Sequence, residues 1–172
     1  MTYLSTTTNG EKVIRYSAAE TAQFIRTALK RAFPAVRFSV TSKTYSGGAS
    51  VRVRWVDGPN DESVQAVVHR FAGASFDGMQ DLKSYHDTTD ATGQRVHYGA
   101  DYVFTERRFS PAYLGKVAER VARYYRLPAP AIHVSDYDGS AWVDNRDGER
   151  PGGGRDTLGD LILQAARETA AA

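Results

Sequence analysis

The stretch that decides the fold reads Val51-Arg52-Val53-Arg54-Trp55-Val56, and a shorter run of the same kind, Val36-Arg37-Phe38-Ser39-Val40, precedes it. In both runs apolar side chains alternate with polar ones, which is the period of a strand with one buried face. The turn residues Tyr45-Ser46-Gly47-Gly48 lie between them, so we expect the two strands to pair as a hairpin. Its polar face should carry three arginines, namely Arg37, Arg52 and Arg54.

Helical patterns flank this hairpin on both sides. Ser17-Ala18-Ala19-Glu20 has the form of a capping box. A buried stripe at helical spacing then follows, formed by Phe24, Ile25, Ala28, Leu29 and Ala32, and this predicts a helix over residues 18–32. The same reasoning predicts helices over residues 61–72, after Ser110-Pro111 and over residues 157–171. Because strands and helices do not alternate regularly, the order of elements predicts an α+β fold, with an antiparallel sheet and helices packed mainly on one face.

Composition divides the chain into three parts. Residues 1–16 are polar and rich in Thr and are expected to form an N-terminal arm. Residues 17–149 should form a single α+β domain, and residues 150–172 a Gly-rich linker with a C-terminal helix. Short strands are also expected on both sides of two turns, Thr89–Gly93 and Asp138-Gly139.

The bulk composition excludes several classes of protein. The chain has 172 residues, of which 41% are hydrophobic and none is Cys, and this removes disulfides, thiolate metal sites and thiol nucleophiles. Its start has no signal-peptide pattern, and no apolar run approaches the roughly 20 residues that a membrane span needs. We therefore expect a cytoplasmic protein without a membrane partner.

The net charge of +2 is unevenly distributed along the chain. Residues 1–56 contain nine Lys or Arg and two Glu, a balance of +7, whereas residues 57–172 contain thirteen Lys or Arg and eighteen Asp or Glu, a balance of −5. This favours either a basic patch for an anionic partner or elements that simply have a basic side facing the solvent.

Two short loops are the candidates for binding, one at residues 45–59 and one at residues 76–82. A Gly pair lets the backbone approach a ligand closely, arginines supply positive charge, and aromatic side chains supply stacking surfaces. Alternatively, the glycines serve a hairpin turn that needs left-handed dihedral angles, and Trp55, which is in phase with the buried valines, belongs to the core. The residues expected to contact a ligand or partner are Tyr45, Gly47, Gly48, Arg52, Arg54, Asp57, Phe76, Asp77, Met79 and Asp81.

The acidic residues and the histidines leave further alternatives open. A divalent metal ion could be bound by three carboxylates on these loops, those of Asp57, Asp77 and Asp81. Two of them also begin turn sequences, in which an Asp side chain accepts hydrogen bonds from nearby amides. A second cluster could form across a hairpin from His86, Asp87, Asp90 and His97, although no two histidines have metal-binding spacing. We assign no catalytic residue, no metal site and no cofactor.

Several motifs occur together in this chain. They are the helix Thr21–Phe33 with Pro34, Phe38-Ser39-Val40, Tyr45-Ser46-Gly47-Gly48, Ser50-Val51-Arg52-Val53, Trp55, Asp57-Gly58-Pro59, Phe76-Asp77-Gly78-Met79, Asp81-Leu82, Gly99-Ala100-Asp101-Tyr102-Val103-Phe104 and Arg107-Arg108 before Ser110. In this combination the chain resembles the family called large polyvalent protein-associated domain 29, over residues 18–126. The resemblance implies a module of phages and conjugative elements, found in long multi-domain proteins and in small free-standing ones, that enters a new host with the mobile DNA and protects or establishes it.

We therefore predict a non-enzymatic binding module of a mobile genetic element. It would engage a host defence protein or nucleic acid in the host cytoplasm through the loops at 45–59 and 76–82, and its role in counter-defence or establishment follows from the resemblance. One alternative is a metal-dependent enzyme that acts on a phosphate-containing substrate through the three carboxylates. Another is a sponge that captures a small signalling nucleotide without chemistry.

Overall fold

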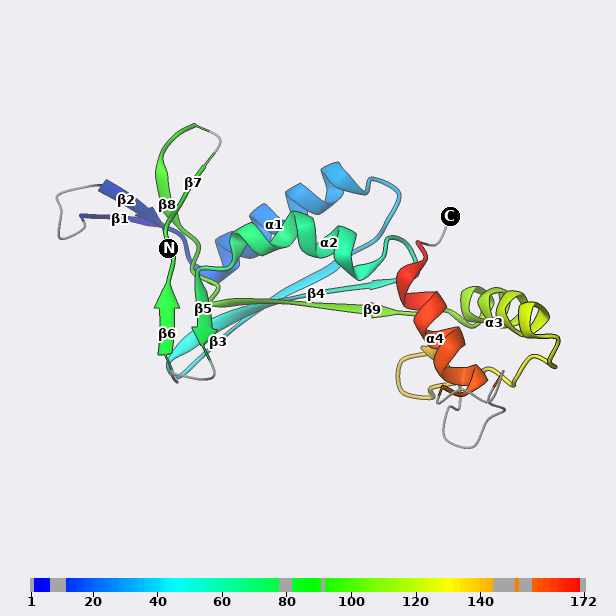
Figure 1. Cartoon of the computed structure of the whole chain (residues 1–172). Helices are drawn as coiled ribbons and strands as arrows, with labels where there is room; N and C mark the ends of the chain where they lie inside the picture. Colours follow the sequence, from blue (N-terminus) through cyan, green and yellow to red (C-terminus); the bar gives the residue numbers. More distant parts are fainter. Residues whose placement is uncertain are drawn as a thin grey trace. The chain divides into compact units, whose positions relative to one another are not determined.

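The computed structural model describes residues 2–6, 12–77, 82–90, 92–143, 151 and 156–170. The chain forms two compact units that interleave along the sequence. Unit 1 contains Met1–Arg54 and Glu62–Glu106, and unit 2 contains Trp55–Asp61 and Arg107–Ala172. Helices and small sheets of mostly antiparallel strands confirm the predicted α+β class (Figure 1). These two units are defined by contacts in space. The division of the chain into residues 1–16, 17–149 and 150–172, which rests on composition, stays a prediction.

The predicted hairpin forms the centre of unit 1. β3 (Ser39–Tyr45) pairs antiparallel with β4 (Gly48–Val56), and Thr41 lies opposite Arg52. The side chains of β4 alternate as predicted, because Val51 and Val53 are fully buried whereas Arg52 is exposed. The alternation read from the sequence therefore gives the correct face of the sheet for each of these side chains.

The first strand of the hairpin begins at Ser39 and not at Val36 as the alternation predicts. After the preceding helix the chain is still turning at residues 34–35, and the Val36 amide donates to the Phe33 carbonyl at 3.1 Å. Arg37 is exposed but precedes the strand, so it does not stand on the sheet face that the sequence assigned to it. Trp55, in contrast, is buried as predicted.

A third strand, β9 (Tyr102–Arg108), continues this sheet beyond β4 and gives the order β3-β4-β9. The Asp101 amide donates to the Ala49 carbonyl near one end, and the Asp57 amide donates to the Arg108 carbonyl near the other. These bonds show that β9 runs parallel to β4 (Figure 1). The carboxylate of the buried Asp101 also accepts from the Ala49 amide at 2.8 Å, which fixes the start of both strands.

Two helices cover one face of this sheet (Figure 1). α1 (Ala18–Ala32) starts at the predicted capping box, since Ser17 Oγ accepts from the Glu20 amide and the Glu20 carboxylate accepts from the Ser17 amide. α2 (Asp61–Val68) continues into a 3-10 turn, η1 (His69–Phe71), so the helical segment ends close to the predicted residue 72. The buried side chains of these elements and of the sheet include Ala22, Ile25, Leu29, Val40, Val51, Val53, Val64, Val68 and Phe71.

The other strands of unit 1 form two small sheets. β1 (Tyr3–Thr6), β2 (Lys12–Arg15), β8 (Arg95–His97) and β7 (Thr88–Thr89) make a sheet in the order β1-β2-β8-β7, with β2 and β8 parallel. β5 (Ala74–Asp77) pairs antiparallel with β6 (Leu82–Tyr85). The segment expected to form an arm thus contains a strand hairpin. It is held in unit 1 by Val13, which is fully buried.

Unit 2 is built from two helices and a short hairpin. α3 (Pro111–Tyr125) follows the predicted cap Ser110, and α4 (Leu158–Glu168) follows a second capping box at Thr157. β10 (His133–Val134) and β11 (Ala141–Trp142) pair across the predicted turn at Asp138-Gly139. These elements share a core of their own, formed by Phe109, Leu114, Val117, Ala118, Ala122, Ala141, Val143, Leu158, Ile162 and Ala166.

Arg107 joins the parts of unit 2. Its guanidinium donates to the carbonyls of Ala166 and Thr169, both at 2.9 Å, at the C-terminal end of α4. It also lies over the rings of Phe109 and Tyr113, 5.1 and 5.3 Å from their centroids. Because the last carbonyls of a helix have no partners within the helix, one guanidinium with five N–H donors can satisfy several of them and fix the end of α4.

The helices are short compared with a membrane span. α1 and α3 have 15 residues each, and in the part of the chain that the structure describes no helix is both long and apolar enough to cross a bilayer.

Candidate nucleic-acid interface

The face of the β3-β4-β9 sheet that is turned away from α1 and α2 carries several exposed side chains, those of Thr41, Lys43, Tyr45, Arg52 and Phe104. Since side chains alternate across a sheet, this face is formed by every second residue of the three strands. The ion pair between Arg54 and Glu106 identifies the matching positions on β4 and β9. We call the part of this face that belongs to unit 1 the outer face, and by this alternation it consists of Ser39, Thr41, Lys43, Tyr45, Gly48, Ser50, Arg52, Arg54, Tyr102, Phe104 and Glu106.

Three cations stand on the outer face. Lys43 and Arg52 are exposed diagonal neighbours on adjacent strands, and neither forms an ion pair within the described residues. The third cation, Arg54, lies 3.0 Å from the Glu106 carboxylate, and the two side chains are 39% and 36% exposed. An ion pair this exposed contributes little stability because water screens it. Arg54 can therefore exchange Glu106 for a phosphate group at little loss of free energy.

Three aromatic rings share this face with the cations. Phe104 is 49% exposed and Tyr45 is 43% exposed. Tyr102 is half-buried, and its ring lies beside that of Phe104, with 6.0 Å between centroids and 30° between planes. Exposed rings of this kind stack on nucleobases, each of which presents a π face whatever the sequence. Open sheets that combine such rings with cations are one of the surfaces on which proteins bind single-stranded nucleic acid.

The glycines expected to approach a ligand form the turn of the β3–β4 hairpin. Tyr45 pairs with Gly48, which leaves a two-residue loop of Ser46 and Gly47. Gly47 has a φ of +88°, in the left-handed region that residues with a Cβ disfavour. The turn interpretation accounts for this glycine, while Tyr45 adds its ring to the end of the outer face.

Asp57 belongs to unit 2, and its carboxylate is engaged there. One oxygen accepts from the Ser110 amide at 2.8 Å and the other from Ser110 Oγ at 2.7 Å. The residue has a left-handed φ of 54°, which aims the carboxylate at the cap of α3. These bonds account for an Asp at this position through the structure of unit 2, and they use the oxygens through which a metal ion would be bound.

The second predicted loop belongs to the β5–β6 hairpin. Phe76 and Asp77 are the last residues of β5 and pair with Lys83 and Leu82, and the structure describes their backbone alone. Met79 and Asp81 lie outside the described residues. Within the ranges that are described, no group of three His, Asp or Glu side chains is arranged to hold a metal ion.

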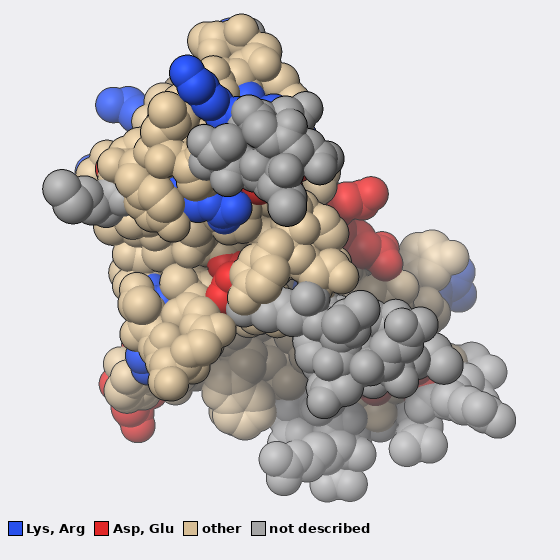
Figure 2. Space-filling view, turned by 90° about the vertical axis from the view of Figure 1, so that its left-hand side faces the viewer, with Lys and Arg blue, Asp and Glu red and all other residues tan. Residues whose placement is uncertain are grey.

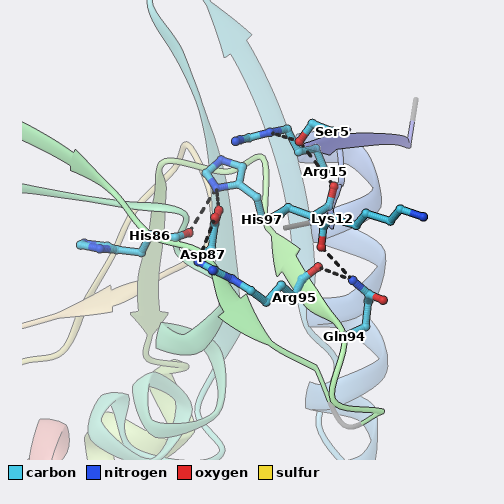
Figure 3. Close-up of polar contacts among 9 residues, drawn as sticks. Ser5, Lys12, Arg15, His86, Asp87, Gln94, Arg95 and His97 are labelled. Carbon is cyan, nitrogen blue, oxygen red and sulfur yellow. Dashed lines mark hydrogen bonds and ion pairs between the residues drawn. The ribbon is translucent and has the colours of Figure 1, made fainter. Parts of the chain in front are cut away.

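The histidines and acidic residues around β8 form a polar cluster (Figure 3). His97 Nδ1 lies 3.2 Å from the Asp87 carboxylate and 3.1 Å from the His86 carbonyl oxygen. Arg95 also contacts Asp87, at 3.5 Å, whereas Asp90 accepts hydrogen bonds within its own turn. The four residues considered as a metal cluster therefore do not converge on one point, and their contacts fix β8 against the segment before β7.

The positive charge of the first part of the chain is divided between two sides of unit 1. α1, with Arg26, Lys30 and Arg31, covers the side of the sheet opposite the outer face. Figure 2 shows a different face, on which Lys and Arg side chains are separated by neutral surface. The excess of Lys and Arg in the first part of the sequence therefore does not form one continuous basic surface. One group of cations lies on α1, and another lies on the outer face.

Among the cations and aromatic rings of the outer face, three were not predicted as contacts from the sequence, namely Lys43, Tyr102 and Phe104. The alternation in residues 101–105 marks a strand, but it does not show that this strand lies beside β4. The contact that reveals the pairing joins residues 52 positions apart. The available signal was the period of two, which puts Tyr102 and Phe104 on one side of their strand.

The family model for large polyvalent protein associated domain 29 matches residues 16–110, which confirms the resemblance seen in the motifs. The matched segment runs from Tyr16, before α1, to the cap of α3, and it includes the whole outer face. No curated protein and no solved structure matches the chain. Because the family model covers more than half of the 172 residues, the chain belongs to the family of large polyvalent protein associated domain 29.

Proposed function

We propose that this domain is a non-enzymatic binding module that holds single-stranded nucleic acid on its outer face. The observation that carries the proposal is the meeting of exposed rings and cations on one open side of the β3-β4-β9 sheet. Bases would stack on the rings, and phosphates would pair with the cations.

The placement of these groups fits a strand of nucleic acid lying on the sheet. Tyr102 and Phe104 stand on β9, whereas Lys43 and Arg52 stand on the other two strands. Neighbouring strands are about 4.8 Å apart, so bases stacked over β9 leave the phosphates within reach of the long cationic side chains. A duplex hides the faces of its bases, and the rings therefore favour a single strand.

Family membership supports a setting in a mobile genetic element. In the cytoplasm of a new host, the module would bind nucleic acid of the element or of the host and contribute to counter-defence or establishment. A host defence protein that packs on the same exposed rings is the competing outcome of the test.

The test is fluorescence anisotropy with a labelled single-stranded oligonucleotide of about 12 nucleotides. Titrations in about 50 to 200 mM NaCl should give a slope of log K against log salt of about −2, since three cations would neutralise three phosphates. Arg52→Gln should weaken binding and reduce the magnitude of the slope by about 0.7. Lys30→Gln, on the exposed side of α1, is the matched control and should bind like the unaltered chain.

Three outcomes would contradict the proposal: no binding, equal loss in the Lys30 control, or a duplex bound as tightly as the single strand. Capture of a stoichiometric host protein that Phe104→Ala abolishes, together with no oligonucleotide binding, would replace nucleic acid by a protein partner.

A further inference from the structure

A second candidate site lies in unit 1, apart from the outer face. A cavity of about 360 Å³ opens between α1, η1 and the segment that contains β7 and β8, and no outer-face residue lines it. Its volume falls within the range of about 300–1,000 Å³ that small-ligand pockets occupy. All of its lining residues belong to the segment that matches the family model.

Four aromatic rings form one wall of this cavity, with Tyr98 at their centre. The Tyr98 ring is 5.9 Å from Tyr16, to which it lies nearly parallel at 20°, and 5.0 Å from the buried Phe71. Phe24 completes the group, 5.9 Å from Tyr98, and is 37% exposed. Phe71 therefore packs this wall against the core, while Phe24 leaves part of the wall exposed. A planar ligand ring can stack on that exposed part.

Two arginines line the same cavity. Arg31 and Arg70 are exposed, and neither is paired with a carboxylate in the part of the chain that the structure describes. Arg70 lies over the Phe71 ring, 4.9 Å from its centroid, and this cation–π contact holds its guanidinium at the aromatic wall. Guanidinium groups bind phosphate through paired hydrogen bonds.

The remaining polar side chains that line the cavity are groups that can form hydrogen bonds with a base or a sugar. Asp90 accepts from the amide and hydroxyl of Thr92, and these bonds lower the pKa of the carboxyl and turn it toward its own loop. Tyr98 also lines the cavity, and burial raises the pKa of its hydroxyl. The hydroxyls of Thr88 and Thr89 also line the space.

α1 contributes to this cavity through a side of its own. Phe24, Thr27, Ala28 and Arg31 follow one another at helical spacing and line the cavity, whereas the buried stripe of the helix runs through Ile25 and Leu29. The sequence pattern assigned Phe24 to the buried stripe, and the structure puts its ring at the boundary between the core and the cavity.

We propose that this cavity binds a nucleoside phosphate, with the base against the aromatic wall and the phosphate held by Arg31 and Arg70. The inference does not depend on the function proposed for the outer face, because the two sites share no residue. The nucleoside phosphate is either a free nucleotide or the phosphorylated end of a strand, and the experiments below separate these two sources.

The first experiment is isothermal titration calorimetry of the full chain with AMP and GMP, compared with adenosine and inorganic phosphate. At least one of the two nucleotides should bind. Adenosine and inorganic phosphate should each bind at least about tenfold more weakly than that nucleotide, since each lacks one of the two groups that the cavity contacts. Binding of phosphate as tight as that of both nucleotides, or no binding of either nucleotide, would overturn the proposal.

Variants then locate the nucleotide. Arg31→Gln and Arg70→Gln should each lower nucleotide affinity about tenfold through the loss of a charged hydrogen bond. Lys30→Gln, the neighbour of Arg31 that does not line the cavity, should leave affinity unchanged. Thr27→Trp fills the cavity from an exposed position, which spares folding, and should abolish binding. Unchanged affinity in Thr27→Trp and in both arginine variants would overturn the location.

A competition experiment separates this site from the outer face. Arg52→Gln should leave nucleotide affinity unchanged, and an oligonucleotide without a terminal phosphate should not displace the nucleotide. A second oligonucleotide of the same sequence carries a 5′ phosphate. If only this one displaces the bound nucleotide, the ligand is a phosphorylated strand end, and if neither does, the ligand is a free nucleotide. Displacement by both oligonucleotides, with loss of nucleotide affinity in Arg52→Gln, would move the nucleotide to the outer face and overturn the proposal.

Discussion

Arg54 on β4 and Glu106 on β9 form an ion pair of 3.0 Å on the outer face of the sheet. The pair joins two parallel strands whose residues are 52 positions apart in the sequence. It also lowers the net positive charge of the face, since Glu106 is the acidic residue among the outer-face positions. Because both side chains are more than a third exposed, the pair is open to competition from an anionic ligand.

Glu106→Gln should therefore raise the affinity for single-stranded nucleic acid. The change removes a negative charge near the phosphates and releases Arg54, and the gain should be about fivefold at low salt and smaller at high salt. The free energy of unfolding should change by less than about 1 kcal/mol. Anisotropy titrations at two salt concentrations measure the effect, and an unchanged or lower affinity would argue against phosphates lying beside this pair.

Phe104→Ala tests stacking separately from charge. The loss of one stacked base should lower affinity about tenfold, and the salt slope should stay the same because no counterion contact is lost. Tyr124→Ala is the matched control, since Tyr124 is 80% exposed on α3 of unit 2. Equal losses in both variants would show that the effect is not specific to the outer face.

Asp57→Asn should affect stability and not ligand binding. The carboxylate accepts two hydrogen bonds from Ser110, and weakening them should lower the free energy of unfolding by about 1–3 kcal/mol. A double-mutant cycle with Ser110→Ala in urea denaturation measures the coupling between the two residues. Additive effects, or normal stability combined with lost binding, would return Asp57 to the ligand-contact role expected from the sequence.

Glu20 makes the stability of the fold depend on pH in the acidic range. Hydrogen bonds from the Thr2 hydroxyl first, and then from Ser17, lower the pKa of Glu20 from 4.5 to about 2. A carboxyl whose pKa is lower in the folded state adds stability above its unfolded pKa, and this stability is lost as the pH falls through the folded value. Glu20→Gln should therefore flatten the decrease in Tm between pH 4.5 and 2.

The control for this measurement is Glu62→Gln, at an exposed position of α2. Circular dichroism melts at several pH values compare the variants. The same decrease in Tm for Glu20→Gln as for the unaltered chain would show that the capping carboxylate is not the group that titrates.

Local sequence signals predicted the elements well where the cause is local. The Ser17–Glu20 capping box fixed the start of α1, and the alternation in residues 51–56 correctly divided the valines from Arg52. Gly47 was open to two interpretations, and its φ of +88° is accounted for by the turn.

Relationships between distant segments could not be read from the same signals. Nothing local in Asp57 shows that its partner is Ser110, and nothing in Phe104 shows that its strand lies beside Arg54. Phe24 illustrates the same limit, because the edge of an apolar stripe looks the same in sequence whether it faces the core or a cavity. The role of each of these residues depends on which elements lie next to each other, and tertiary packing decides that.

Binding of single-stranded nucleic acid on the outer face is tested most directly by photo-crosslinking of an oligonucleotide that carries 4-thiothymidine, followed by mass spectrometry of the crosslinked peptides. Crosslinks are expected at Tyr102, Phe104 and Tyr45, and Arg52→Gln should reduce their yield. Crosslinks confined to segments outside β3, β4 and β9, or no crosslink above that of the denatured chain, would contradict binding on the outer face.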